Sequence, residues 1–165
     1  MDPLRVALAH IRLLVLDADG VLTDGAIYWS DRGEAGLAFH VRDGWGIRRL
    51  IEAGFLLAVI SGRRSEALAG RVQALGISHL HQAVEDKGAT LANLQASLEC
   101  GVMETAALGD DEPDLSLFSR AAVRLAVADA HPSLLQAADY VTRASGGRGA
   151  VREVADLLLA ARSPA

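Results

Sequence analysis

A short apolar run that ends in two aspartates constrains the fold of this chain more than any other stretch. Residues Leu13–Leu16 are continuously apolar, which is typical of a strand buried on both faces of a parallel sheet. Asp17 and Asp19 follow at once, and Gly20 comes directly after them. Carboxylates at the end of a buried strand are costly in free energy unless a cation or a reaction requires them there. The sequence therefore predicts a functional site at the carboxyl end of this strand.

The composition indicates one domain, which we place at residues 1–165, without a strongly charged surface. The net charge is −5 and no block of Lys or Arg is present, so nucleic acid and anionic membranes are not expected partners. The single cysteine, Cys100, excludes an internal disulfide and is typical of a reducing compartment. No apolar run approaches the roughly 18 residues of a membrane span, and the first residues lack a signal-peptide layout. We therefore expect a cytoplasmic protein.

Apolar runs and helical spacings alternate along the chain. The expected strands lie at 11–16, 55–60, 77–81, 106–108, 124–127 and 140–141. The expected helices lie at 42–53, 67–75, 86–98, after 111 to about 121, 131–136 and 150–161. This alternation predicts an α/β fold, a doubly wound, Rossmann-like parallel sheet with helices on both faces. Ligands of such sheets bind outside the carboxyl ends of the strands, where the strand order reverses.

Between the first and second long strands, a small insertion takes the place of a cap domain. The β-prone segments 25–30 and 37–41 flank a turn-rich stretch and predict a hairpin flap over about 24–41. The apolar side chains of this flap are Ile27, Tyr28, Trp29 and Phe39. Because water solvates such a surface poorly, we expect hairpins to associate between subunits of a homo-oligomer, with a tetramer as the predicted state. A neighbouring subunit would then supply the lid.

The carboxylates after the predicted strands have the chemistry that hydrolysis of a phosphate monoester needs. Asp17 can attack phosphorus and form an aspartyl-phosphate, while Asp19 can protonate the leaving oxygen and later activate water. Asp110 follows a later strand and can complete an oxygen-rich site for Mg²⁺. As isolated residues, the two aspartates of the first loop would also fit a turn or a helix cap. Their combination with the downstream polar residues favours a metal-dependent phosphohydrolase.

Three further residues can bind the phosphoryl group. Ser61 and the backbone N–H of Gly62 follow the second long strand and can bind phosphoryl oxygens at a helix N-terminus. Lys87, near the start of its own helix, can supply the balancing positive charge. The simpler alternatives are an N-cap for Ser61 and a solvated surface position for Lys87.

The order of these motifs resembles the haloacid dehalogenase (HAD) superfamily of phosphatases. The matching segments are Asp-x-Asp-Gly-Val-Leu-Thr-Asp at 17–24, Ile-Ser-Gly-Arg at 60–63, the lone Lys87, and Gly-Asp-Asp-x-x-Asp at 109–114. Further segments at 38–47, 127–132 and 146–153 resemble the 3-deoxy-D-manno-octulosonate 8-phosphate phosphatase family. This resemblance implies Mg²⁺-dependent hydrolysis of that sugar acid phosphate to the free sugar acid and phosphate, a step of lipopolysaccharide biosynthesis.

The resemblance also implies a role for each residue of the motifs. Asp17 would be the nucleophile and a Mg²⁺ ligand, and Asp19 the acid/base and a ligand through its backbone carbonyl. The third protein ligand would be Asp110, and the phosphate would be bound by Ser61, Gly62 and Lys87. The sugar acid would meet Arg63 and Arg148, with Asp111 and Asp114 in support. By the same resemblance, the tail and helix at about 144–162 would carry Arg148 toward a neighbouring subunit's site.

Four alternatives stay open or are weighed on particular residues. A related nine-carbon sugar acid phosphate would need only a few different contacts, and a non-catalytic oligomerisation domain would share the fold. A signalling receiver domain would need an aspartate after the strand at 77–81, where Gln82 and Ala83 stand. His79 and His81 share a strand face, but no further ligand with zinc-site spacing accompanies them.

Overall fold

The predicted buried strand, β1 (Leu13–Leu16), lies inside a six-stranded parallel sheet. The computed structural model describes residues 2–162. β1 pairs with β4 (Leu56–Ile60) on one side and with β6 (Thr105–Gly109) on the other. The sheet has the order β5-β4-β1-β6-β7-β8, completed by β5 (His79–His81), β7 (Val123–Ala126) and β8 (Tyr140–Val141). Every residue of β1 is fully buried, as the unbroken apolar run predicts.

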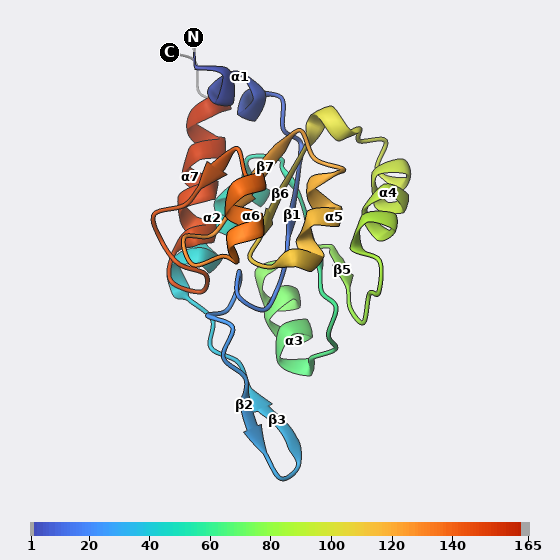
Figure 1. The fold of residues 1–165 in the computed structure, drawn as a ribbon, viewed down its shortest axis with the longest axis vertical. Coiled ribbons are helices and arrows are strands. Elements are labelled where there is room, and N and C mark those ends of the chain that lie inside the picture. The colour runs from blue at the N-terminus through green and yellow to red at the C-terminus, as the bar shows by residue number, and fades with distance from the viewer. Residues whose placement is uncertain (1, 163–165) are drawn as a thin grey trace.

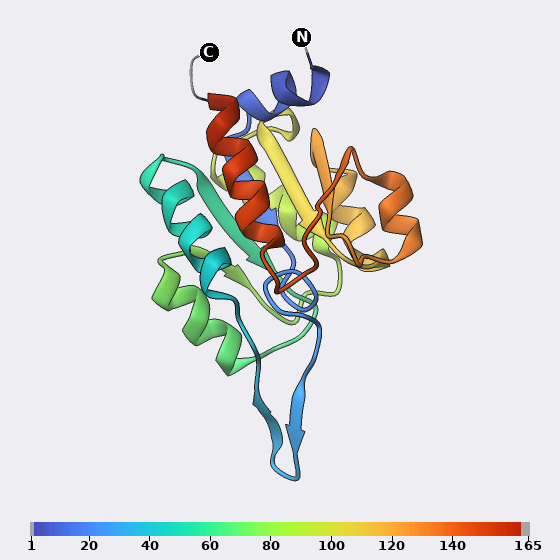
Figure 2. The same cartoon turned by 90° about the vertical axis from the view of Figure 1, so that its left-hand side faces the viewer.

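Helices cover both faces of this sheet (Figures 1 and 2), which confirms the predicted α/β class. One face carries α2 (Val41–Glu52), α3 (Glu66–Leu75) and α7 (Ala150–Arg162), and α2 packs along α7. The other face carries α4 (Lys87–Ser97), α5 (Leu115–Phe118) and α6 (Pro132–Ala137). The chain begins with α1 (Pro3–Ala9), which packs against α7. No described helix is long and apolar enough to cross a membrane.

The order of the strands reverses beside β1. The chain passes from β1 to β4 and β5 on one side, then returns across the sheet to β6, β7 and β8 on the other. The carboxyl ends of β1, β4 and β6 therefore meet at one edge, where parallel sheets of this kind bind ligands. This is the edge at which the sequence predicts the site.

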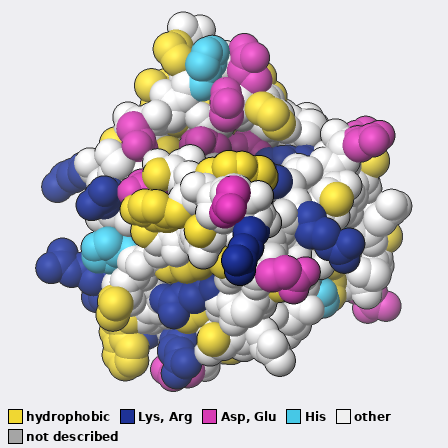
Figure 3. Space-filling model, turned by 90° about the horizontal axis from the view of Figure 1, so that it is seen from below, with side chains coloured by type: hydrophobic (Ala, Val, Ile, Leu, Met, Phe, Trp, Pro, Cys, Tyr) yellow, Lys and Arg dark blue, Asp and Glu magenta, His cyan; other side chains and the backbone are white. Residues whose placement is uncertain are grey.

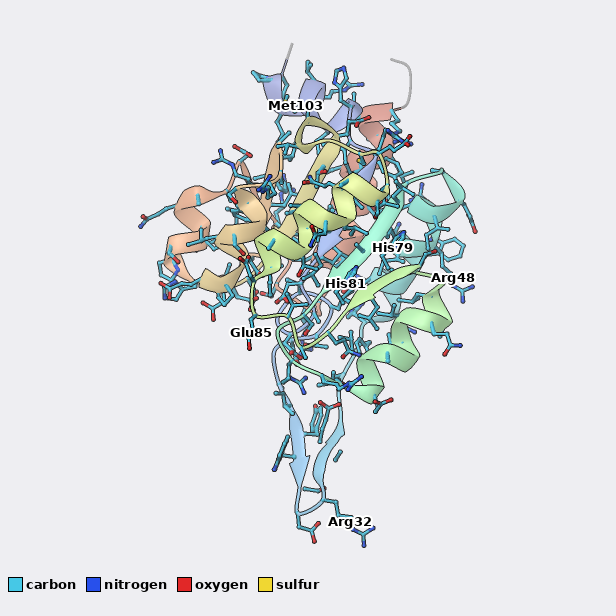
Figure 4. All side chains as sticks on the ribbon, turned by 90° about the vertical axis from the view of Figure 1, so that its right-hand side faces the viewer. Arg32, Arg48, His79, His81, Glu85 and Met103 are labelled. Atoms are coloured by element: carbon cyan, nitrogen blue, oxygen red, sulfur yellow. The ribbon has the colours of Figure 1, made fainter. Side chains whose placement is uncertain are left out.

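The predicted hairpin is present and projects away from the sheet (Figures 1 and 4), but its second strand lies earlier than expected. It consists of β2 (Tyr28–Ser30) and β3 (Gly33–Gly36). The expected strand at 37–41 is wrong, and Val41 already begins α2. The cause is a tight turn at the tip: Ser30 Oγ donates to Gly33 O at 3.1 Å and accepts from Arg32 N at 3.2 Å. The chain thus reverses two residues before the turn-rich stretch ends.

The predicted helix after Asp111 is shorter than expected. A 3₁₀ turn, η2 (Glu112–Asp114), precedes the four-residue α5. Pro113 lies in the first turn, where its missing N–H costs little. The chain leaves α5 early because Ala122 N donates to the carbonyl oxygens of Val102 and Thr105, which draws it back toward the sheet.

Candidate active site

A cleft of about 390 Å³ opens at the carboxyl ends of β1, β4 and β6. Its lining consists of Asp17, Asp19, Gly25, Ser61, Gly62, Arg63, Lys87, Asp110, Asp111, Pro113 and Asp114. Strands and turns far apart in sequence thus bring every predicted site residue except Arg148 to one place. Gly25 and Pro113 are the lining residues to which the sequence assigned no role.

Lys87 lies buried between two carboxylates. Its Nζ donates to Asp17 Oδ1 and to Asp114 Oδ1, each at 2.7 Å. Only 8% of the Lys87 side chain is exposed, and 1% of Asp114. Burial alone would lower the pKa of Lys87, but the facing carboxylates outweigh it and raise that pKa. The structure therefore supplies a fixed ammonium charge beside Asp17, and the alternative of a solvated surface lysine is wrong.

Three carboxyl groups crowd around this ammonium. Burial first, and the charge of Asp114 second, raise the pKa of Asp17 well above its ordinary value. Burial also raises the pKa of Asp110 to about 6, although a hydrogen bond with Asp17 opposes the shift. Oxygen atoms of Asp17, Asp110 and Asp114 lie within 4.8 Å of one another. With all three ionised, one ammonium leaves two negative charges uncompensated, which a divalent cation would neutralise.

The donor set fits a hard cation. Carboxylate oxygens are the ligands that Mg²⁺, Ca²⁺ and Mn²⁺ prefer, whereas zinc sites are built mainly on His nitrogen and Cys sulfur. Within residues 2–162, His79 and His81 belong to no cluster of three potential metal ligands, and Figure 4 places them on β5. The zinc interpretation therefore has no structural support.

Asp114 shapes the turn that presents Asp110. Its Oδ2 accepts from the backbone N–H of Asp110 at 3.0 Å and of Asp111 at 3.4 Å, while its Oδ1 accepts from Lys87. Both oxygens are thus occupied by protein donors, so Asp114 supports the cluster rather than offering a free ligand atom. Asp111 caps the same turn, because its Oδ1 accepts from Glu112 N at 2.8 Å.

Gly20 gives Asp110 its room. It has a φ of +87°, and a Cβ at this position would lie 1.9 Å from Asp110 Oδ2. Only glycine satisfies both the backbone conformation and the close approach. Gly20 is therefore needed because any side chain at this position would collide with the carboxylate of Asp110, which follows β6.

The opposite wall of the cleft joins Asp19 to the hairpin. Arg63 donates from Nε to Asp19 Oδ2 at 3.0 Å and from Nη2 to Asp19 Oδ1 at 2.7 Å, a two-point ion pair. Its Nη1 donates to Glu34 of β3, and Glu34 Oε1 also accepts from Ser65 Oγ at 2.5 Å. These bonds from Ser65 and Arg63 lower the pKa of Glu34. Sequence reasoning missed Glu34, because nothing near it in the chain indicates a partner across the cleft.

Ser61 stands where β4 ends. The residue is 2% exposed, and its Oγ accepts from Arg63 N at 3.3 Å. The N-cap of α3 is Ser65, whose Oγ accepts from Leu68 N, so the alternative reading of Ser61 as a helix cap is wrong. Ser61 also lines the cleft, where the sequence predicts a phosphate-binding residue.

Arg148 lies outside the cleft of its own chain. Its side chain is 68% exposed, and Nη2 donates to Asp24 Oδ2 at 3.2 Å. The glycines before it pack on the outer side of the loop that carries the two aspartates. Gly147 N donates to Val21 O at 2.9 Å, and a Cβ on Gly146 would lie 1.7 Å from Gly20 O. This tail packs closely against the loop that carries Asp17 and Asp19, and the contact of Arg148 with substrate stays a prediction.

Fold and site together define a hydrolase of the haloacid dehalogenase-like class, whose family model matches residues 77–153. The 3-deoxy-D-manno-octulosonate 8-phosphate phosphatase of Yersinia pestis is 50% identical over 154 residues, covering 93% of this chain and 82% of the relative. The enzyme of that name from Escherichia coli K12 is 47% identical over 153 residues, covering 93% and 81%. This chain therefore belongs to the 3-deoxy-D-manno-octulosonate 8-phosphate phosphatase family and is a phosphoric monoester hydrolase.

Solved structures agree with this assignment. The crystal structure of the Yersinia pestis phosphatase superposes with a TM-score of 0.95 at 48% identity, covering 98% of this chain and 87% of that one. The phosphatase of Moraxella catarrhalis, solved with a magnesium ion, a phosphate ion and a KDO molecule, superposes with a TM-score of 0.94 at 38% identity, covering 98% and 93%.

Proposed function

We propose that this chain hydrolyses 3-deoxy-D-manno-octulosonate 8-phosphate to the free sugar acid and phosphate, with Mg²⁺ and through an aspartyl-phosphate. The observation that carries the proposal is the buried Asp17–Lys87 pair, with Asp110 beside it, at the carboxyl end of β1. The names of the relatives support the substrate, and the magnesium, phosphate and KDO of the Moraxella catarrhalis structure support the ligand set.

Asp17 is the nucleophile in this mechanism. Lys87 fixes its Oδ1, so the other carboxylate oxygen attacks phosphorus while the bond between phosphorus and the sugar oxygen breaks. The Ser61 hydroxyl and the Gly62 N–H donate to the phosphoryl oxygens from the end of β4. A bound Mg²⁺ would be held by carboxylate oxygens of Asp17 and Asp110 and the backbone carbonyl of Asp19, and it would reduce the repulsion between nucleophile and phosphate.

Asp19 moves the protons. In its carboxylic acid form it donates a proton to the departing sugar oxygen. The resulting carboxylate then takes a proton from the water that attacks the phosphorus of the aspartyl-phosphate, and phosphate leaves as the bond between phosphorus and the Asp17 oxygen breaks. Arg63 orients Asp19 through two hydrogen bonds, and Glu34 holds a third N–H of the same guanidinium. Since a guanidinium has five N–H groups, two remain for the carboxylate of the sugar acid.

The experiment is a phosphate-release screen with and without Mg²⁺. It includes 3-deoxy-D-manno-octulosonate 8-phosphate, a nine-carbon sugar acid phosphate and neutral sugar phosphates. We expect the highest kcat/KM for the first and none without metal. Activity retained in Asp17→Asn, or absent on every sugar acid phosphate, would overturn the proposal.

Two variants separate proton transfer from metal binding. Asp19→Asn keeps the backbone carbonyl, so we expect its Mg²⁺ affinity to stay near that of the unmodified protein while turnover falls. Asp110→Ala removes a carboxylate of the acidic cluster, so its Mg²⁺ affinity should fall steeply. Equal losses of Mg²⁺ affinity in the two variants would contradict the role given to Asp19.

We also propose that the hairpins associate between subunits and that the assembly is a tetramer. Tyr28 and Trp29 are 56% and 72% exposed in the single chain, a large apolar surface at the end of a thin hairpin. Phe39 contributes less than its sequence position implied, because it packs against the core and Arg71 lies over its ring at 5.8 Å.

Light scattering tests this assembly. We expect a mass above that of one chain at micromolar concentration, and a lower mass for Tyr28→Ser/Trp29→Ser. Met103→Ser is the matched control, because Met103 is 74% exposed at the opposite end of the molecule (Figure 4). A monomeric protein with full activity would overturn this part of the proposal.

A further inference from the structure

A second cavity, of about 600 Å³, lies apart from the catalytic cleft and is larger than it. The segment after β8, helix α7 and the start of α2 form its walls, and no residue of the cleft lines it. Four arginines from these elements face it: Arg42, Arg143, Arg148 and Arg152. Seen from the hairpin end, Lys and Arg side chains gather on this side of the molecule (Figure 3).

The acidic residues of the cavity do not neutralise all of these arginines. Glu153 is occupied by the backbone, because its carboxylate accepts from the N–H groups of Arg143 and Ala144 and from the hydroxyl of Tyr140. Asp156 pairs with Arg152 at 2.9 Å and with Arg49 at 2.8 Å.

Two guanidinium groups consequently remain open. Within residues 2–162, neither Arg42 nor Arg143 has a side-chain hydrogen bond or an ion pair. They come from different elements, the first turn of α2 and the segment after β8. The chain as a whole has a net charge of −5, yet this cavity contains two guanidinium groups that pair with no carboxylate of residues 2–162.

A buried carboxylate on α2 holds the part of the cavity wall that α7 and the turn before it form. Asp43, 2% exposed, accepts from Gly149 N at 3.3 Å and from Arg152 N at 2.9 Å. A buried carboxylate thus ties the turn before α7 to α2 and holds the backbone of two cavity residues in place. The open arginines also extend from a held backbone, because Arg42 directly precedes Asp43 and the N–H of Arg143 donates to Glu153, and this lowers the conformational entropy lost when a ligand binds.

We infer that this cavity binds a small polyanion with at least two phosphate or carboxylate groups. Planar guanidinium groups bind such oxygens in pairs of parallel hydrogen bonds, and two open ones in a cavity select a ligand with two anionic ends. The volume lies within the roughly 300–1,000 Å³ of small-molecule sites. The inference is independent of the substrate proposed for the catalytic cleft.

Calorimetric titration with inorganic tripolyphosphate, in EDTA so that no metal enters the cleft, tests the site. We expect saturable binding that weakens at least tenfold in Arg42→Gln/Arg143→Gln. The control Arg32→Gln/Arg120→Gln removes the same charge elsewhere, and Ser61→Ala alters the catalytic cleft; both should bind within about twofold of the unmodified protein.

Three results would overturn the inference. They are no binding by the unmodified protein at millimolar tripolyphosphate, equal weakening in the two double variants, and weakening in Ser61→Ala as large as in the cavity variant. Far-UV circular dichroism of each variant establishes that the fold is kept.

Discussion

Lys87→Met removes the ammonium group that lies between Asp17 and Asp114 and leaves both carboxylates buried. Each hydrogen bond is 2.7 Å long, and no side chain of the three is more than 8% exposed. A hydrogen bond to a charged group contributes about 1.5–3 kcal/mol, so two give about 3–6 kcal/mol. Breaking a buried ion pair on one side costs about 3–5 kcal/mol. We therefore expect the free energy of unfolding at pH 8 to fall by about 3–5 kcal/mol.

The loss of unfolding free energy in Lys87→Met should become smaller as the pH falls. Burial holds the pKa of Asp17 above its ordinary value, and removal of Lys87 raises that pKa further. An acid whose pKa is higher in the folded chain than in the unfolded one destabilises the fold only at pH values above its unfolded pKa, about 3.9 for Asp. The deficit is therefore full at pH 8 and fades as the pH falls through the folded pKa toward about 4.

Urea unfolding in EDTA, followed by far-UV circular dichroism, measures the effect. Tryptophan fluorescence is a weak probe here, because Trp29 and Trp45 are 72% and 55% exposed. Adding Asp114→Asn to Lys87→Met removes one uncompensated charge and should restore part of the stability. A loss below about 1 kcal/mol at pH 8, or one equally large at pH 5, would refute the buried-charge reasoning.

Three further predictions concern the cleft and its supports. Glu34→Gln removes the carboxylate charge that holds the Arg63 guanidinium, so kcat should fall by up to roughly 100-fold in steady-state assays. The control Asp31→Asn, at the hairpin tip, should change kcat little. Because the pKa of Asp110 is about 6 and the metal needs the ionised form, the apparent Kd for Mg²⁺ should rise about tenfold per unit as the pH falls below 6; calorimetry showing no pH dependence would contradict this. Gly146→Ala puts a Cβ 1.7 Å from a backbone oxygen of the catalytic loop and should cost about 1–3 kcal/mol of stability as well as activity, whereas Gly70→Ala meets no atom within 4 Å and should do neither.

The sequence predicts the sheet and most of the cleft because both depend on local signals. Apolar runs mark strands buried on two faces, and in a parallel sheet the polar residue after each run reaches the same edge. Asp17, Ser61 and Asp110 each follow such a run. Lys87 has no such signal, and its place beside Asp17 depends on where α4 begins.

The features that the sequence misses are set by contacts across the fold. Glu34 accepts hydrogen bonds from Arg63 and Ser65, which lie between β4 and α3 and are distant from it in the sequence. The register of the hairpin depends on one hydroxyl, that of Ser30, which closes the turn early. Arg148 pairs with Asp24 through a tail whose path only the packed structure defines.

The contact between Gly146 and the loop after β1 joins two segments that are synthesised far apart in time. Domains generally fold as units during synthesis, so a domain is completed only when all of its segments have been made. Here the aspartates of the loop are made early, and the glycine pair that backs them is made after the strands of the described sheet. A nascent chain released only as far as Thr142 would already contain Asp17, Lys87 and Asp110, yet its catalytic loop would lack this backing. The cleft would thus be complete only once the tail has been made and packs against the loop.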